Sequence, residues 1–284
     1  MGHEHDTRRR GRKNLNEMSM DPCFCEIVEG DGPVMATAIH DGHALREEVA
    51  DRMALGEAER LREEDPHTGA WTSLAPTRLV VLHSRFEIDL NRPREKSVYR
   101  RPEDAWGLKV WKEEPADGIV QRSLESYDAF YAMVERIYCR LAARFGRFVH
   151  FDLHSYNHRR SGPSGSPADP AANPEVNVGT GTMRDRAAWA PLIDRFIADL
   201  SAAEFLGRQL DVRENIRFRG GNLGRWAHQT FPEAGCVLSI EFKKFFMDEW
   251  TGELDRVQHA AIGRALAKTV AGVLEELRRL GAKS

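Results

Sequence analysis

Short runs rich in β-branched and apolar residues alternate along the chain with longer segments in which apolar residues recur every three or four positions. The short runs predict strands at residues 34–39, 78–89, 148–153, 175–178, 210–214 and 236–241. Strands that alternate with helices favour a mostly parallel sheet, because each crossover between parallel strands passes over one face of the sheet. We therefore expect the α/β class, with one mostly parallel mixed sheet flanked by helices on both faces.

Three longer segments carry an apolar stripe at helical spacing, at residues 130–145, 189–200 and 254–277. For the first of them, Ser123 is the expected N-cap and Gly146 is the residue just past the end. A serine hydroxyl caps helix N-termini, and glycine tolerates the left-handed backbone that follows a helix. The stripes indicate helices that bury one face in the core rather than cofactor sites.

Length and charge indicate one ordinary globular domain. The chain has 284 residues and a formal net charge of −3, so no overall field draws it to nucleic acid or to an anionic membrane. No apolar stretch approaches the roughly 20 residues of a membrane span, and no apolar segment typical of a secretion signal follows the N-terminal charges. We expect residues 1–30, with a basic run at 8–13, to be a loosely ordered extension. Residues 31–284 would form the domain, with a long Ser-, Gly- and Pro-rich loop at 161–174.

The four cysteines do not indicate a disulfide framework in a chain of this length. Cys139 and Cys236 lie in apolar patterns and are expected to be small buried residues. Cys23 and Cys25 have no second pair of thiols nearby, which makes them a weak pattern for zinc. This cysteine usage favours a reducing compartment, and we expect a cytoplasmic protein.

Polar residues follow four of the predicted strands. His40 follows the first, Asn91 and Arg92 follow the second, His154 follows the third, and Glu241 ends the last. In open α/β sheets, ligands bind outside the carboxyl ends of the strands. The convergence of these side chains therefore indicates a catalytic centre at one edge of the sheet.

Two imidazoles and one carboxylate are a frequent ligand set for catalytic zinc, which keeps a further position open for water. His40 and His154 would supply the imidazoles, and Glu64 or Asp65, which follow the first predicted helix, would supply the acid. A local pair of His40 and His43 is an alternative. In the plainer interpretation, the histidines are hydrogen-bonded residues of no special function and the acids are solvated at a helix end. The pattern predicts one zinc ion, with the choice of acid open.

Neighbouring residues suggest further roles. Asp152 precedes His154 by two positions and shares its strand face, so it is a candidate to orient that ligand. Glu241 at the end of an apolar strand favours a general base over a structural partner of a nearby cation. Arg92 is placed to bind a carboxylate with both arms of its guanidinium, whereas Arg85 would equally suit a surface position.

Several motifs resemble those of the N-formylglutamate amidohydrolase family. The most specific lies at residues 83–92, where His-Ser-Arg is followed by a short apolar step and Asp-Leu-Asn-Arg. The others are Ile39-His40-Asp41-Gly42, Glu64-Asp65-Pro66-His67-Thr68, Gly107-Leu108-Lys109-Val110-Trp111, Asp152-Leu153-His154-Ser155, Val178-Gly179-Thr180, residues 215–221 and Ile240-Glu241. They agree in order and spacing over residues 33–280.

This resemblance implies a zinc-dependent hydrolase with a core similar to that of the zinc carboxypeptidases. The founding activity of the family is hydrolysis of N-formyl-L-glutamate to formate and glutamate, in histidine breakdown. The resemblance makes His40, His154 and Asp65 the zinc ligands, with Glu64 as the reserve acid, and makes Glu241 the general base. The substrate residues that it implies are Arg92, Arg85 and Arg219 for the carboxylates, with Asn91 and Tyr99 for orientation.

The chain departs from the family pattern in two motifs. Ile39 stands where a proline precedes the first histidine, and Asp41 follows that histidine in place of a small residue. Ile216 and Arg217 stand where a proline is expected after Asn215. These differences concern the substrate more than the reaction, for which we expect a small anionic molecule and no nucleic-acid or membrane partner.

Three alternatives remain open. The chain would be a hydrolase of another N-acyl amino acid or small peptide on the same metal core, or a relative that binds metal without catalysis. The third is a phosphate or nucleotide binder, suggested by the glycines at 179–181 and 220–221. These glycines lack the strand–glycine–helix context that a phosphate loop requires, which disfavours the third alternative.

Overall fold

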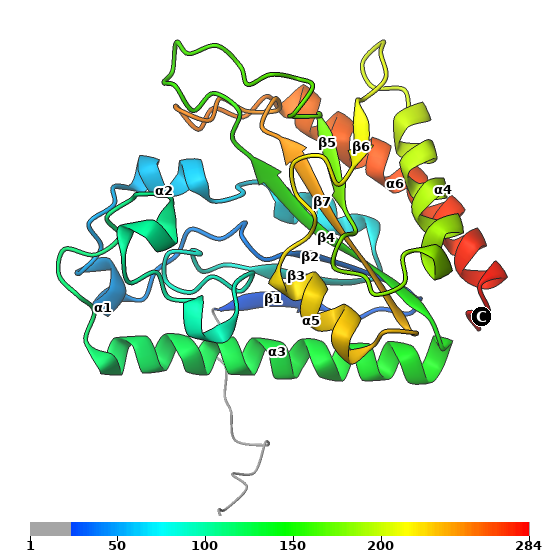
Figure 1. Ribbon diagram of the computed structural model, residues 1–284, viewed down its shortest axis with the longest axis horizontal. Coiled ribbons are helices and arrows are strands. Elements are labelled where there is room, and N and C mark those ends of the chain that lie inside the picture. Colours follow the sequence, from blue (N-terminus) through cyan, green and yellow to red (C-terminus); the bar gives the residue numbers. More distant parts are fainter. Residues whose placement is uncertain (1–23, 284) are drawn as a thin grey trace, which may run out of the picture.

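A seven-stranded mixed sheet forms the centre of the computed structural model, which describes residues 24–283 (Figure 1). Its strands are β1 (Cys25–Val28), β2 (Val34–Ala38), β3 (Thr77–Val81), β4 (Phe148–Tyr156), β5 (Val176–Gly179), β6 (Val212–Glu214) and β7 (Gly235–Lys243). They lie in the order β1-β3-β2-β4-β7-β5-β6. The four strands β3, β2, β4 and β7 run parallel, while β1 and the parallel pair β5–β6 run opposite to them. The expected α/β class with a mostly parallel mixed sheet is confirmed.

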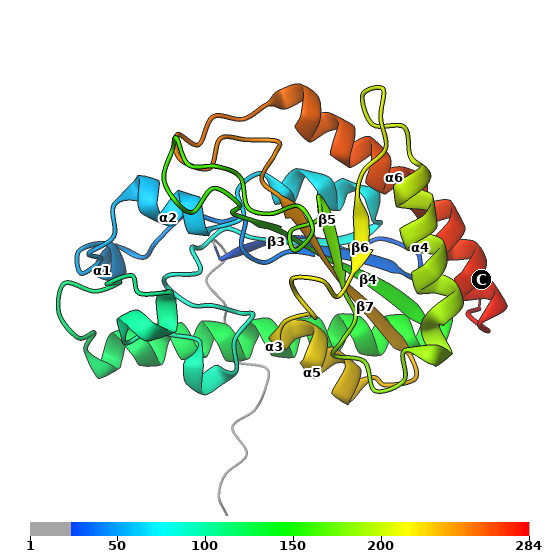
Figure 2. The ribbon, with the colours of Figure 1, turned by 45° about the horizontal axis from the view of Figure 1, so that its top comes forward.

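Helices cover both faces of this sheet (Figure 2). On one face lie α3 (Asp117–Phe145) and α5 (Asn222–Thr230), and on the other lie α4 (Ala190–Ala202) and α6 (Arg256–Arg279). The short helices α1 (Glu47–Ala50) and α2 (Glu57–Glu63) precede β3 in the chain. Within residues 24–283, no helix combines the length and apolarity needed to cross a membrane.

The alternation of side chains along β4 explains the two layers. Phe148 packs into the core on the α3 side, whereas Val149 and Phe151 pack into the core on the α4 and α6 side. Successive residues of a strand point to opposite faces, so His154 shares its face with Phe148. The polar residues of β4 thus project from the α3 side of the sheet at its carboxyl end.

The predicted helices agree with α3, α4 and α6, but the N-cap predicted for α3 was wrong. The helix begins at Asp117 after Ala116, and Ser123 lies buried inside it, where its hydroxyl accepts a hydrogen bond from Arg46 Nη2 at 2.5 Å. The helix extends beyond Ser123 because Ile119 and Val120 continue the buried stripe toward the N-terminus. Gly146 follows the last turn with φ of 75°, as expected for the residue after a helix.

The second predicted strand was too long. β3 ends at Val81, and residues 82–93 form a loop. The strands that pair with β3 are only four and five residues long, so the backbone beyond Val81 has no continuous partner. The loop instead buries Glu87 and Asp89, whose carboxylates accept hydrogen bonds from residues outside the sheet. It still reaches the carboxyl end of the sheet, where Asn91 and Arg92 were expected.

Most of the extension expected over residues 1–30, including the basic run at 8–13 and Cys23, lies outside the described residues. The described part of that segment belongs to the sheet. Cys25–Val28 forms β1, which pairs antiparallel with β3 from Cys25 opposite Val81 to Val28 opposite Arg78. A four-residue edge strand with one partly buried residue carries too little apolar pattern to be predicted from sequence.

The loop expected at residues 161–174 is present between β4 and β5, without helix or strand. The prediction for the cysteines was right for Cys236, which is buried in β7, and wrong for Cys139, which is exposed. Cys139 lies on α3 between the buried Tyr138 and Leu141, and the rotation of the helix turns its side chain toward solvent.

Candidate active site

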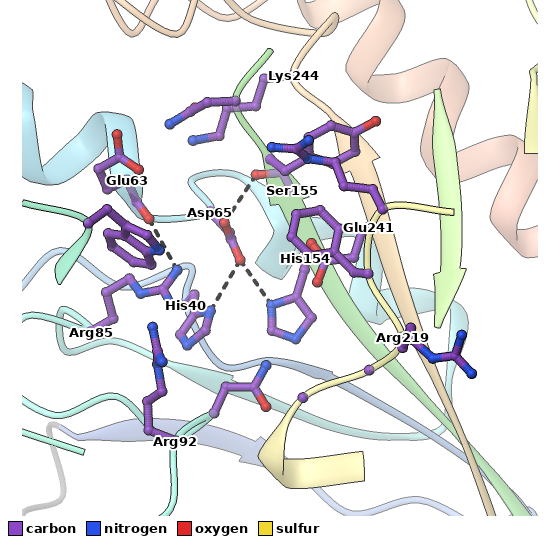
Figure 3. Close-up of a pocket in the computed structure, with 18 of the residues that line it drawn as sticks. His40, Glu63, Asp65, Arg85, Arg92, His154, Ser155, Arg219, Glu241 and Lys244 are labelled. Carbon is purple, nitrogen blue, oxygen red and sulfur yellow. Dashed lines mark hydrogen bonds and ion pairs between the residues drawn. The ribbon is translucent and has the colours of Figure 1, made fainter. Parts of the chain in front are cut away.

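A cavity of about 370 Å³ opens at the carboxyl ends of β2, β4 and β7 (Figure 3). His40 lies just beyond β2, His154 lies near the end of β4, and Glu241 lies near the end of β7. The lining also includes Glu63, Asp65, Arg85, Asn91, Arg92, Trp106, Ser155, Tyr156, Asn157, Arg160, Arg217, Phe218, Arg219, Gly220, Gly221 and Lys244. The sheet therefore brings together the four strand-end groups that the sequence indicated.

His40, Asp65 and His154 form a buried cluster in the wall of the cavity. His40 Nδ1 lies 3.3 Å and His154 Nδ1 lies 3.0 Å from the same atom, Asp65 Oδ2. One potential ligand atom from each residue lies within 4.8 Å of the other two. None of the three side chains is more than a few per cent exposed, so the cluster is held by the protein rather than by solvent.

The backbone places each member of this cluster. His154 points from the α3 side of β4, and His40 lies in the turn that follows β2. Asp65 comes two residues after the end of α2, where its backbone N–H donates to His40 O at 2.9 Å. This bond joins the segment after α2 to the segment after β2, which brings two residues 25 positions apart to one point.

The outer nitrogen of each imidazole faces a second carboxylate. His40 Nε2 lies 2.8 Å from Asp89 Oδ1, and His154 Nε2 lies 3.0 Å from Asp152 Oδ2. Asp152 in turn accepts a hydrogen bond of 2.9 Å from the Thr37 hydroxyl. Carboxylates in this outer position fix the ring orientation of metal-binding histidines and make them better ligands.

The charges of the cluster favour a cation. Burial opposes the charge on His154, but the carboxylates of Asp152 and Glu241 outweigh burial and raise its pKa well above the usual range. Burial likewise opposes the charge on Asp65, yet hydrogen bonds from His154 and His40 lower its pKa below the usual range. The carboxylates thus favour positive charge at the imidazoles, and a divalent metal would also supply such charge. The donor set, two nitrogens and one carboxylate oxygen, suits such a metal.

The structure separates the two candidate acids. The Glu64 carboxylate points away from the cluster, lying 2.6 Å from His43 Nδ1 and accepting a hydrogen bond from the Ser84 hydroxyl. His43 is thereby turned away as well, and its Nε2 lies 3.0 Å from Arg60 Nη2. Within residues 24–283, Asp65 is the acid that meets His40 and His154, and neither Glu64 nor His43 joins them.

Glu241 faces His154 across two paired strands. The parallel register of β4 and β7 sets His154 directly opposite Glu241, and both side chains line the cavity. Burial raises the pKa of Glu241 to about 7, with Asp65 and Asp152 acting in the same direction and His154 against it. A carboxylate with a pKa near neutrality can both take up and return a proton at physiological pH.

The residues expected to hold substrate carboxylates differ in how far their side chains are already bound to other groups of the protein. Arg85 is bound to Asp89 at 2.8 Å, whereas Arg92 is 38 % exposed and lies 3.7 Å from Asp89. Arg219 is exposed and lines the same cavity. Asn91 lines the cavity, but its Oδ1 accepts the backbone N–H of Leu223 at 3.1 Å, which anchors the first turn of α5.

Tyr99 is not part of the lining, and its hydroxyl donates to the buried Asp89. Asp89 was not predicted as a site residue. Its carboxylate also lies 2.8 Å from His40 Nε2 and accepts a hydrogen bond from Arg85 Nη2. One carboxylate thus joins a ligand of the candidate metal centre to an arginine of the cavity wall. The signal in the sequence was an acid inside an apolar stretch just before Asn91.

Other lining residues were also missed. Trp106 is 46 % exposed, has a left-handed backbone with φ of 54°, and lies with its ring 4.9 Å from the Arg85 guanidinium. Arg160 and Arg217 also line the cavity and add positive charge to it. These residues come from loops without periodic pattern, so the sequence alone could not place them at the cavity.

An α/β protein with a buried His–Asp–His cluster beside the carboxyl ends of its parallel strands, facing a carboxylate, has the architecture of a hydrolase with a candidate metal centre. The particular relationship follows from the sequence. The chain belongs to the N-formylglutamate amidohydrolase family, whose sequence profile matches residues 32–246, and it is an amidohydrolase by class. No curated protein sequence shows significant similarity to it.

Two solved structures share the fold, and a third gives a weaker match. The N-formylglutamate amidohydrolase of Ralstonia eutropha JMP134 superimposes with a TM-score of 0.69 at 20 % sequence identity, covering 90 % of this chain and 99 % of that one. A gene product of Agrobacterium tumefaciens gives 0.62 at 16 % identity, covering 92 % and 98 %. A metallo-carboxypeptidase of Pseudomonas aeruginosa gives 0.38 at 17 % identity, covering 86 % and 57 %.

Proposed function

We propose that this chain is a zinc-dependent amidohydrolase that cleaves N-formyl-L-glutamate to formate and glutamate. The observation that carries the proposal is the meeting of His40 Nδ1, His154 Nδ1 and Asp65 Oδ2 in one cavity with the Glu241 carboxylate. His40, His154 and Asp65 would hold the zinc, since two imidazole nitrogens and one carboxylate oxygen are a ligand set of catalytic zinc sites. When bound there, zinc would polarise the amide carbonyl and make water a better nucleophile.

The roles of the protein groups follow from their positions. Glu241 takes one proton from the attacking water while the oxygen of that water bonds to the formyl carbon. It then gives the proton to the amide nitrogen as the carbon–nitrogen bond breaks, so that a free amine and formic acid leave, and the acid loses its proton to become formate. Asp89 and Asp152 hold the two imidazoles in place from behind, at 2.8 and 3.0 Å.

The cations of the cavity support an anionic substrate. Three of these cations are arginines with little carboxylate contact, namely Arg92, Arg217 and Arg219. Within residues 24–283, the one ion pair that any of them forms is that of Arg92 with Asp89, at 3.7 Å. Guanidinium groups with free N–H donors bind carboxylates through paired hydrogen bonds. N-formyl-L-glutamate offers two carboxylates, and the family name makes it the first substrate to test.

A substrate panel tests this proposal. The purified protein is assayed with N-formyl-L-glutamate, N-acetyl-L-glutamate, N-acetyl-L-alanine and a small peptide, before and after zinc is removed and restored. We expect kcat/KM to be highest for N-formyl-L-glutamate and activity to depend on restored zinc. Equal turnover of N-formyl-L-glutamate and N-acetyl-L-alanine would overturn the substrate assignment in favour of another N-acyl amino acid hydrolase. Full activity without metal would overturn the zinc assignment.

The second candidate is a relative that binds metal without catalysis. The presence of both imidazoles, Asp65 and Glu241 in one cavity argues against it, because a binding protein needs no general base. Zinc binding without turnover of any member of the panel would favour it. We also propose a cytoplasmic location, on the basis of the cysteine usage, and fractionation of cells that express the protein would test it.

A further inference from the structure

Lys244 is a buried lysine in the wall of the cavity, and the proposed reaction gives it no role. It is the first residue after β7 and is 2 % exposed. Its Nζ donates to Arg62 O at 2.6 Å and to Glu64 O at 2.7 Å. Burying an ammonium group costs free energy unless it is hydrogen-bonded and paired with charge, so its place in the fold calls for a physical reason.

The partners of Lys244 are carbonyl groups at the C-terminal end of α2. The last carbonyls of a helix have no partner within the helix, and they form the negative end of its dipole. The carboxylates of Asp65, Glu63 and Glu249 also favour the charge on Lys244, although burial lowers its pKa to about 8. The ammonium group therefore caps α2 and lies in a negative environment.

One of these carbonyls belongs to the peptide group that precedes Asp65. The oxygen of the Glu64–Asp65 peptide accepts from Lys244 Nζ, and the N–H of the same peptide donates to His40 O at 2.9 Å. This peptide plane is thus held from both sides. Because a planar peptide fixes the direction in which the next Cα leaves, the two bonds restrict where the Asp65 carboxylate lies.

We propose that Lys244 is a positioning residue that holds Asp65 in the geometry required for metal binding, an inference that rests on the proposed metal site. The lysine lies three residues after Glu241, and it joins the strand of the proposed base to the segment of the acidic ligand. Figure 3 shows Asp65 between His40 and His154, with Lys244 and Arg92 on opposite sides of it. Lys244 would act on Asp65 through the backbone.

The test compares Lys244→Met with Lys243→Met. Methionine keeps the length of the side chain but has no donor, so the carbonyls of Arg62 and Glu64 lose their partner. Lys243 is the matched control, because it is the adjacent lysine and its Nζ donates to Asn173 O at 2.8 Å, outside the cavity lining. Lys244→Gln, which keeps N–H donors without the charge, is the second variant if the methionine protein does not fold.

Three measurements separate positioning from mere stability. Zinc affinity is measured by chelator competition on metal-free protein, coordination is followed by the visible spectrum of the Co²⁺-loaded protein, and hydrogen exchange is measured over residues 60–68. In Lys244→Met we expect the zinc dissociation constant to rise roughly 10–100-fold, as for the loss of other outer partners of metal ligands. We also expect an altered Co²⁺ spectrum and faster exchange at the Asp65 amide, with Lys244→Gln in between and Lys243→Met like the wild type.

The outcomes distinguish this inference from the function on which it rests. If the wild type binds zinc and a folded Lys244 variant binds it equally well with an unchanged Co²⁺ spectrum, Lys244 is only a helix cap and the inference is overturned. If the variant raises KM for the substrate but leaves zinc affinity unchanged, Lys244 contacts substrate instead, which also overturns it. A wild type that binds no zinc would overturn the proposed metal site and this inference together.

Discussion

The two sides of the cavity are built on different physical principles. The ligand side, formed by His40, Asp65 and His154, is almost fully buried, and each imidazole has a carboxylate on both of its nitrogens. The rim side, which includes Arg217 and Arg219 on the loop after β6, is exposed and leaves these guanidinium groups without an ion pair among the described residues. We infer that the proposed chemistry depends on the buried groups beside the strand ends and that substrate choice depends on a loop.

Removing a histidine from the ligand side gives the largest expected effect. His154→Ala removes one of the three proposed zinc ligands and should abolish stoichiometric zinc, with activity falling on the order of a thousandfold or more to background. Metal analysis and hydrolysis of N-formyl-L-glutamate check this. His43→Ala is the control, because His43 pairs with Glu64 away from the cluster, and it should keep its zinc. Stoichiometric zinc in His154→Ala would contradict the ligand assignment.

Loss of the proposed base, Glu241, should lower turnover without loss of the metal. Glu241→Gln keeps the size of the side chain but cannot accept the proton of water, so kcat should fall roughly 10²–10⁴-fold. Zinc content and KM should change little, because Glu241 is not one of the three clustered ligand residues. Steady-state kinetics with metal analysis measure both quantities. An unchanged kcat would show that another group accepts the proton.

A rim substitution should affect binding more than chemistry. Arg219→Ala should lower kcat/KM for N-formyl-L-glutamate roughly 10–100-fold, mainly through KM, as expected for the loss of a hydrogen bond to a charged group. The zinc content should stay at the wild-type value. Arg225→Ala removes an exposed arginine of α5 outside the cavity lining and serves as the control. A fall in kcat alone would mean that Arg219 acts in the chemical step, which would contradict the division between the two sides of the cavity.

The smallest effect concerns the hydrogen bonds that attach α5 to β7 and to Thr182. His228 on α5 accepts the Val237 backbone N–H at 3.0 Å through Nε2, and its Nδ1 lies 2.9 Å from the Thr182 hydroxyl. The ring must therefore be neutral in the folded protein, and burial lowers its pKa to about 4.

The unfolded chain binds a proton at His228 below pH of about 6.5 that the folded protein does not bind. The free energy of unfolding should therefore fall as pH drops from about 6.5 toward 4, by up to about 1.4 kcal/mol per pH unit. Urea unfolding at pH 7 and pH 5 should show a loss about 2 kcal/mol larger in the wild type than in His228→Gln. Equal losses in both proteins would mean that His228 is charged or solvated in the native state.

The sequence predicted most of the ligand side because that side follows strand periodicity. His40, His154 and Glu241 lie at ends of β-branched runs, and the two-residue repeat placed Asp152 and His154 on one face. The sequence left the choice between Asp65 and Glu64 as the acidic ligand open, because two adjacent acids at the end of a helix differ only in the direction in which their side chains point. The structure distinguishes them through the hydrogen bonds that turn Glu64 toward His43 and Ser84.

The rim and the outer contacts could not be predicted in the same way. Trp106, Arg160 and Arg217 come from loops, whose course depends on contacts between residues far apart in the sequence. Asp89 was visible as a motif residue, but its simultaneous contacts with His40 and Arg85 depend on the bend after β3. The length of β3 was overestimated because apolar residues continue in the sequence past Val81, where the pairing of β3 with β1 and β2 ends.

The pairing of β4 with β7 also limits how this protein can change during evolution. His154 stands opposite Glu241 because the two central strands align residue for residue from Phe148 and Gly235 onward. A single-residue insertion or deletion early in either strand would turn every later side chain of that strand to the opposite face. Changes in the loop after β6 would alter the substrate side of the cavity but leave this register intact, whereas an indel in β4 or β7 before the site would separate the proposed base from the proposed ligand.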